Sequence, residues 1–120
     1  VYGYGGKILV VDLAKGEAAE KPIDEELAKA FLGGVGFTTK LLFDYVDPHV
    51  DPLSPENVLI FGVGALVGTC VPTAARTEAT AKSPITGLFG TSNSGRHFGL
   101  MLKLSGYDAL VIRGASEKRD

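Results

Sequence analysis

The sequence contains a single cysteine, Cys70, among its 120 residues. One cysteine excludes an internal disulfide framework, and it provides no CxxC pair for zinc or an iron–sulfur cluster. Chains without disulfides are typical of reducing compartments, so we expect a cytoplasmic protein. Because no second thiol or base accompanies it in the sequence, Cys70 itself is expected to be a small buried residue.

Positive charge and long apolar segments are also scarce. The formal net charge is −2, so the chain lacks the overall basic field that is typical of nucleic-acid binding. The longest apolar runs, such as residues 58–63, have the length of a strand and not of a bilayer span. Residues 1–6 resemble no signal peptide, because they have neither a basic start nor a continuous apolar stretch. We therefore expect neither nucleic acid nor a membrane as a partner.

Glycine, in contrast, is abundant, with 16 residues, which predicts many tight turns or a backbone that approaches a ligand closely. The composition of 45% hydrophobic and 22% charged residues is ordinary for a globular protein. A chain of this length can bury one core, so residues 1–120 are expected to form one domain. Because the sequence ends on residues 117–120, just after the last predicted strand, we expect this domain to be truncated.

The apolar pattern predicts an α+β fold with a mixed sheet and a few packed helices. Predicted strands cover residues 7–13, a hairpin partner that ends at Pro22, and residues 58–63, 88–89 and 109–113. Predicted helices are one that Asp24 caps and Gly33-Gly34 ends, one over residues 37–46 and one over residues 94–104.

Residues 73–82 form an extended segment with an unusual alternation. One face carries only small side chains, Ala75, Thr77, Ala79 and Ala81, and the other carries the polar side chains Arg76, Glu78, Thr80 and Lys82. A strand without a large apolar side chain suits a surface on which a flat polar ligand lies. An exposed edge strand, protected by its charges, explains the same pattern and is favoured when this segment is considered alone.

The glycine-rich run of residues 87–96 leads into the third predicted helix. The N-terminus of a helix presents unpaired N–H groups and a positive potential, and it therefore binds anions such as phosphate. Asn93 or Ser94 is the predicted N-cap, and Gly95 leaves room for a phosphate. Arg96, in the first turn, opposes the helix dipole unless an anion is nearby. A routine capped helix with Arg96 in solvent remains open.

Short blocks of sequence along the whole chain are similar, in order and spacing, to one known family. They include Tyr2-Gly3-Tyr4-Gly5-Gly6-Lys7-Ile8-Leu9-Val10-Val11-Asp12-Leu13, Phe31-Leu32-Gly33-Gly34, Pro55-Glu56-Asn57-Val58-Leu59-Ile60-Phe61, Lys82-Ser83-Pro84-Ile85-Thr86-Gly87, Asn93-Ser94-Gly95 and Gly106-Tyr107-Asp108-Ala109-Leu110-Val111-Ile112. On these blocks the chain resembles the N-terminal domain of the aldehyde ferredoxin oxidoreductase family.

The resemblance implies that the full-length protein oxidises an aldehyde to a carboxylic acid and passes the electrons to ferredoxin. It implies a tungstopterin cofactor, in which two pterins hold one tungsten, together with a [4Fe–4S] cluster and magnesium. The matching part of the family is the front of an α+β domain that cradles the pterins. The family's cluster cysteines and acid/base residues lie outside this part, so we expect the chain alone to hold no catalytic residue and to be inactive. The aldehyde, the choice of tungsten or molybdenum and a homodimer stay open.

The resemblance also implies site residues. Arg76 matches the family's arginine that bridges pterin and cluster, where a guanidinium steadies anionic sulfur and phosphate. Asn93 matches the asparagine that touches the pterin and helps to hold the magnesium. Ser94, Gly95 and Arg96 fall in the same pterin-contacting loop.

Three departures from the family pattern bear on these residues. Ala74-Ala75 replaces a pair of glycines, Arg96 replaces a second glycine, and Val35 replaces an arginine. Each departure crowds or recharges the backbone near the expected cofactor and favours a divergent relative with another substrate. Two further hypotheses stay open: a stand-alone module that binds a pterin or a nucleotide phosphate, and a structural remnant without a working cofactor loop.

Overall fold

The computed structural model describes residues 2–118. Residues 1 and 119–120 lie outside the described residues, and so does part of the segment 117–120 on which the expectation of a truncated domain rests. Along the chain the elements are β1 (Lys7–Asp12), β2 (Glu17–Pro22), α1 (Glu25–Phe31), α2 (Val35–Tyr45), β3 (Val58–Val63), β4 (Thr77–Lys82), β5 (Phe89–Ser94), α3 (His97–Leu104) and β6 (Ala109–Arg113). This arrangement confirms the predicted α+β fold.

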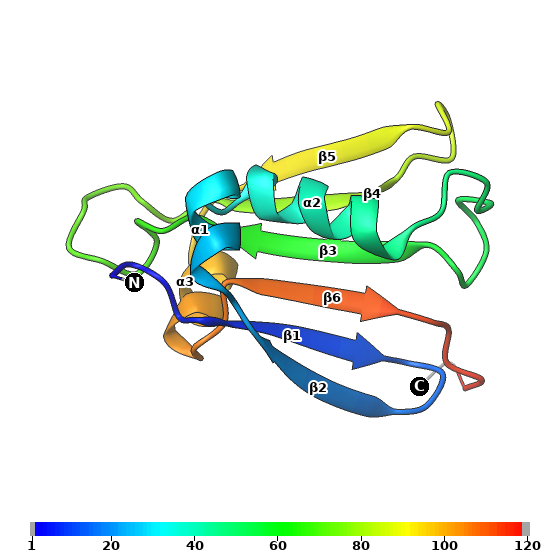
Figure 1. Cartoon of the computed structure of the whole chain (residues 1–120), viewed down its shortest axis with the longest axis horizontal. Helices are drawn as coiled ribbons and strands as arrows, with labels where there is room; N and C mark the ends of the chain where they lie inside the picture. Colours follow the sequence, from blue (N-terminus) through cyan, green and yellow to red (C-terminus); the bar gives the residue numbers. More distant parts are fainter. Residues whose placement is uncertain (1, 119–120) are drawn as a thin grey trace.

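The strands form one six-stranded sheet in the order β2-β1-β6-β3-β4-β5 (Figure 1). The sheet is mixed, as predicted, because β6 pairs with β1 in parallel while the other neighbours pair antiparallel. The last strand therefore lies between the first and the third. The two edges of the sheet are β2 and β5.

The hydrophobic core lies between the sheet and α2. Helices α1 and α2 cover the same face of the sheet (Figure 1), and Leu41 and Leu42 of α2 pack on alternate residues of the central strands. The buried strand residues of this core are Ile8, Val10, Val58, Ile60, Ala109 and Val111. A buried hydrogen bond of 2.8 Å from the Thr80 hydroxyl to that of Thr38 joins α2 to β4.

The opposite face of the sheet carries α3 at one end. There the ring centroids of Phe98 and Phe61 lie 5.1 Å apart. Away from α3 the central strands also present apolar side chains on this face, such as the half-buried Leu110 and Leu59, which is 41% exposed. Among the described residues, no helix covers this part of the sheet.

A buried ion pair between α3 and the start of β6 holds the N-terminal segment in place. The Lys103 ammonium lies 2.7 Å from a carboxylate oxygen of Asp108, and both side chains are almost fully buried. The Asp108 carboxylate also accepts hydrogen bonds from the N–H groups of Gly5 and Gly6, while Lys103 donates to the carbonyl oxygen of Gly3. The glycine-rich N-terminal segment is therefore held against the C-terminal end of α3.

Several predicted boundaries are wrong, mostly where strand pairing extends an element. The predicted strand at residues 88–89 runs on to Ser94 as β5, because each of its residues pairs with β4. Helix α3 consequently begins at His97 and not at residue 94. Helix α2 begins at Val35 and not at residue 37, because Gly34, with a φ of 55°, turns the chain directly into it.

Two further expectations are wrong. Strand β4 lies inside the sheet between β3 and β5, so it is not the exposed edge strand that its pattern favoured. Cys70 is exposed and not buried, because it lies in the loop that joins β3 to β4, outside the packed layers. In residues 2–118, no helix has both the length and the apolar character that crossing a membrane requires.

Candidate functional site

Arg76 and Gly95 meet at the end of the β4–β5 pair. Thr77 of β4 lies opposite Ser94 of β5, so the residue before β4 and the residue after β5 become neighbours. A Cβ atom on Gly95 would lie only 3.3 Å from Nη1 of Arg76. The exposed Arg76 side chain thus packs directly over the Gly95 backbone, and a larger residue at position 95 would displace it.

Arg96 occupies the position before the first residue of α3. Its φ of 70° lies in the left-handed region. This backbone conformation costs free energy for a residue with a side chain, and residues that adopt it cluster at functional sites. The predicted N-cap, Asn93 or Ser94, is wrong, because both residues belong to β5. Arg96 is itself the N-cap and makes no capping hydrogen bond with its side chain. It therefore lies just before the first turn and not within it.

The electrostatics of this corner favour an anion. The first turn of α3 contains no acidic residue, and its N–H groups form the positive end of the helix dipole. Of the ion pairs found in residues 2–118, none involves Arg76 or Arg96. Two arginines without a carboxylate partner next to a helix N-terminus make an unbalanced positive charge.

A hollow of about 200 Å³ lies beside Gly95 on the α3 side of the sheet. Small or hydroxyl-bearing side chains and two aromatic rings line it: Phe61, Thr77, Ala79, Ser92, Ser94, Gly95 and Phe98. In the described part of the chain, the hydroxyl of Thr77 is the one buried side-chain polar atom without a hydrogen-bond partner. That hydroxyl is packed against the backbone of Gly99 in α3, so the features of the hollow that suit a flat ligand are its small side chains and its two aromatic rings.

The side chain of Asn93 lies on the other face of the sheet. Successive strand residues point to opposite faces, so Asn93 is directed away from the hollow that Ser94 lines. Its amide nitrogen donates a short hydrogen bond to Oε1 of Glu78, its partner across the ladder, and the Thr91 hydroxyl donates to Oε2 of the same carboxylate at 2.9 Å. The structure therefore brings Arg76, Ser94, Gly95 and Arg96 together but not the Asn93 amide.

The backbone of Asn93 has a different orientation from its side chain. The Ser83 N–H donates to the carbonyl oxygen of Leu88, directly opposite, at 2.8 Å. Bonded and non-bonded pairs alternate in an antiparallel ladder, so the pair of Glu78 and Asn93, five positions further along, is a non-bonded one. The N–H and C=O of Asn93 consequently point away from β4, toward the open edge of the sheet.

Comparison with known proteins identifies the family of the chain. The sequence model of one protein family, the aldehyde ferredoxin oxidoreductase N-terminal domain, matches residues 8–120 of the chain. Tungsten-containing aldehyde ferredoxin oxidoreductases are 48% identical over 98% of this chain in Pyrococcus furiosus and 47% identical over 98% in Pyrococcus abyssi. The match covers 20% and 19% of these two proteins, so the chain spans about one fifth of the length of these curated relatives.

One solved structure is also similar. It is the active site complex BamBC of benzoyl coenzyme A reductase in complex with 1,5-dienoyl-CoA, and it is 40% identical with a TM-score of 0.94. The likeness covers 98% of this chain and 18% of the solved one. The predicted resemblance is thus confirmed by sequence and by fold: the chain belongs to the aldehyde ferredoxin oxidoreductase family and corresponds to its N-terminal domain.

Proposed function

We propose that this chain is the cofactor-cradling front part of an enzyme that oxidises an aldehyde to a carboxylic acid and passes the electrons to ferredoxin. The family membership and the tungsten-containing relatives support a tungstopterin cofactor, which would supply the redox chemistry when bound. Because the chain spans about one fifth of those relatives, the [4Fe–4S] cluster and the acid/base residues are assigned to polypeptide outside residues 1–120. A ferredoxin partner and a single cysteine favour the reducing cytoplasm.

The pair of unpartnered arginines beside Gly95 is the observation that carries this proposal. Pterin cofactors carry phosphate and sulfur anions, and guanidinium groups bind such anions through charge-assisted hydrogen bonds. Arg76 and Arg96 would bind these anions, helped by the N–H groups of the first turn of α3. Ser94 and Gly95 would contact the ring system from the hollow next to them.

Asn93 is proposed to hold magnesium through its carbonyl oxygen and not through its amide. The side-chain amide lies on the other face of the sheet from the hollow, where its nitrogen donates to Glu78, whereas the backbone carbonyl is directed to the open edge of β5. Magnesium prefers oxygen ligands and usually completes its coordination with phosphates and water. The hydrogen bond from Asn93 to Glu78 would then fix this end of β5 and so position the carbonyl oxygen.

The site assignment predicts that Arg76→Ala in the full-length protein lowers cofactor affinity about ten- to hundredfold. A charge-assisted hydrogen bond contributes roughly 1.5–3 kcal/mol, and 1.4 kcal/mol corresponds to tenfold in affinity. Pterin and tungsten per protein should fall while circular dichroism and the unfolding midpoint stay unchanged, because the arginine is exposed.

Arg113→Ala is the matched control for this variant. Its side chain is 51% exposed at the end of β6, away from the corner, and cofactor content should remain normal. Full cofactor content in both Arg76→Ala and Arg96→Ala would refute the site.

The likeness to the benzoyl coenzyme A reductase complex supports a second candidate, in which the full-length protein reduces an aromatic acyl-CoA. The higher identity to the aldehyde oxidoreductases favours the first candidate. Assays of the full-length protein with an aldehyde plus oxidised ferredoxin, and with benzoyl-CoA plus a reductant, distinguish the two.

A further inference from the structure

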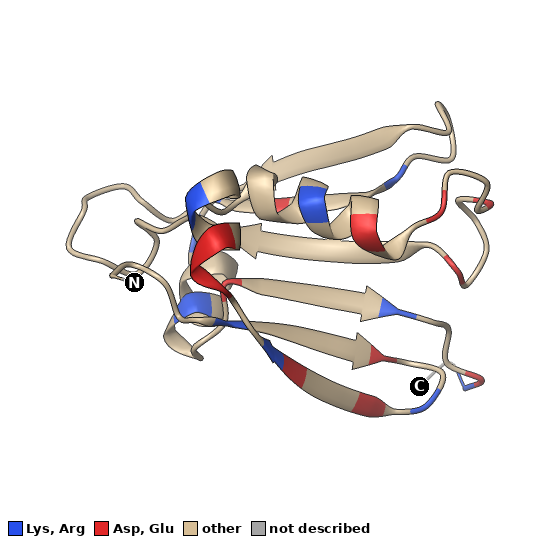
Figure 2. Cartoon of the chain, viewed as in Figure 1, with Lys and Arg blue, Asp and Glu red and all other residues tan. Residues whose placement is uncertain are grey.

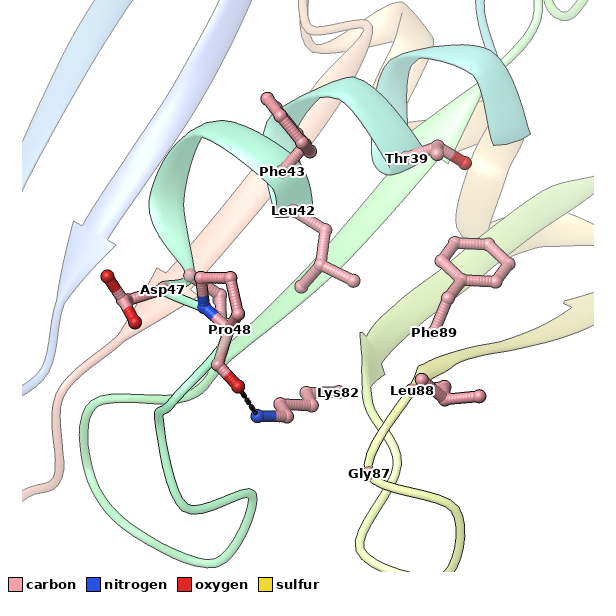
Figure 3. A pocket seen from close by; sticks show the side chains of 10 residues that line it. Thr39, Leu42, Phe43, Asp47, Pro48, Lys82, Gly87, Leu88 and Phe89 are labelled. Atoms are coloured by element: carbon pink, nitrogen blue, oxygen red, sulfur yellow. Dashed lines mark hydrogen bonds between the residues drawn. The ribbon is translucent and has the colours of Figure 1, made fainter.

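An apolar groove lies at the end of β5 opposite to the arginine corner (Figure 3). It has a volume of about 300 Å³ and separates the C-terminal half of α2 from the tip of the β4–β5 hairpin. Leu42 and Phe43 line it from α2, and Leu88 and Phe89 line it from the hairpin. The groove is therefore on the face of the sheet that α1 and α2 cover, and it shares no lining residue with the hollow beside Gly95.

The apolar side chains around this groove are exposed to an unusual degree. The exposed fractions are 83% for Phe43, 71% for Leu88, 44% for Phe89 and 93% for Ile85 in the adjoining turn. Single exposed apolar residues are common on protein surfaces. A contiguous set that borders one groove, however, is typical of a surface that another polypeptide segment covers.

The two charged side chains that line the groove, Lys82 and Asp47, form hydrogen bonds with nearby backbone groups. The Lys82 ammonium donates to the carbonyl oxygens of Pro48, at 2.7 Å, and Val50, at 2.6 Å, and Figure 3 shows the first of these bonds closing one end of the groove. The Asp47 carboxylate accepts a hydrogen bond from the His49 N–H. These bonds hold Lys82 and the loop after α2 in place, so the shape of the groove is set by its own walls.

The neighbouring edge of the sheet lacks the usual protection. Edge strands of monomers carry charges or proline that prevent pairing with other chains. Strand β2, at one edge, contains Glu17, Glu20, Lys21 and Pro22, whereas β5, at the other, contains neither a charged residue nor proline. Figure 2 shows the same contrast, with coloured charges along β2 and none along β5. Strand β2 is therefore suited to an edge in contact with solvent, whereas β5 is suited to an edge that another polypeptide segment covers.

We propose that an apolar segment of the same polypeptide, from outside residues 1–120, packs into this groove and along the Phe89 end of β5. The chain spans 20% of the Pyrococcus furiosus relative and 18% of the solved structure it matches, so in a full-length protein of that size most of the polypeptide would be available to pack against it. A groove that is lined mainly by apolar side chains and held in shape by its own hydrogen bonds suits a covalently connected segment that never dissociates. This packing is independent of the cofactor assignment.

Site-specific photo-cross-linking of the full-length protein tests this packing. A photo-reactive phenylalanine analogue replaces Phe43 or Leu88 in the groove and, as the control, the exposed Ala18 on the protected edge strand β2. All three positions are exposed, so each variant should fold. After illumination, the mass of the cross-linked species and the sequence of the linked peptide are determined.

We expect positions 43 and 88 to cross-link within a single chain to a peptide from outside residues 1–120, at a yield several times that at position 18. Cross-links that join two copies of the chain would overturn the proposal in favour of a dimer interface. Cross-links confined to residues 1–120, or yields no higher than at position 18, would also overturn it.

Discussion

Gly99 lies where α3 approaches the sheet too closely for a side chain. A Cβ atom at this position would overlap the hydroxyl oxygen of Thr77 and lie 3.1 Å from a methyl group of Val63. The glycine thereby seats the N-terminal half of α3 against β3 and β4, and it determines where Arg96 and the first N–H groups of the helix lie.

We expect Gly99→Ala to lower the free energy of unfolding by about 1–3 kcal/mol, the usual cost of overpacking a tight contact. On an unhindered helix the same change would stabilise by about 1 kcal/mol. Chemical denaturation measures the difference. Adding Thr77→Ala should restore part of the loss, because it removes the atom that the new methyl group meets. A neutral Gly99→Ala would contradict the close packing.

At the scale of single residues, the sequence identified most of the arginine corner but not its geometry. Arg76, Ser94, Gly95 and Arg96 are close together, although the reason is the β4–β5 ladder and not a cap on α3. The separate direction of the Asn93 side chain could not be predicted, because it depends on that residue being in a strand. Glu78 was missed as its partner for the same reason, since only the hairpin register pairs the two.

The Lys103–Asp108 pair connects elements rather than single residues. It joins α3, the start of β6 and the N-terminal glycines, whose N–H groups lie more than 100 residues from the carboxylate that accepts them. Glycines have no side-chain pattern that would have revealed this contact, so the sequence did not predict it. Because both charges are buried, each depends on the other.

Asp108→Asn is expected to lower the free energy of unfolding by about 3–5 kcal/mol, because it leaves a buried ammonium without its counter-charge. Thermal and denaturant unfolding measure the loss. Asp12→Asn is the matched control, since Asp12 lies 3.9 Å from the exposed Arg113 and such surface pairs contribute about 0–1 kcal/mol. Equal losses of unfolding free energy in the two variants would contradict the claim that burial makes the Lys103–Asp108 pair more important for stability than an exposed pair.

Among the elements, those with strong local signals were predicted best. The hairpin of β1 and β2 was predicted from branched residues and a glycine turn, and the start of α1 from Asp24, whose carboxylate accepts a 2.6 Å hydrogen bond from the Leu27 N–H. Strand β5 was predicted too short, because its threonine, serine and asparagine residues have no apolar alternation. Pairing with β4 holds it in the sheet, which is a tertiary effect.

At the scale of the whole molecule, the order of the strands was beyond reach of the sequence. The position of β6 between β1 and β3 depends on contacts between distant segments, which no local pattern encodes. The partly open face of the sheet, the unprotected β5 edge and the groove beside it all suit a chain that spans one fifth of its relatives. The proposed cofactor corner and the proposed docking surface thus lie at opposite ends of β5.

Metal and pterin analysis of the full-length protein, purified without oxygen, tests the central claim most directly. The account predicts tungsten and pterin in amounts close to those of the protein, together with iron from the cluster. It also predicts reduction of ferredoxin when an aldehyde is added. A correctly folded full-length protein that contains neither tungsten nor pterin would contradict the claim that the Arg76–Arg96 corner cradles this cofactor.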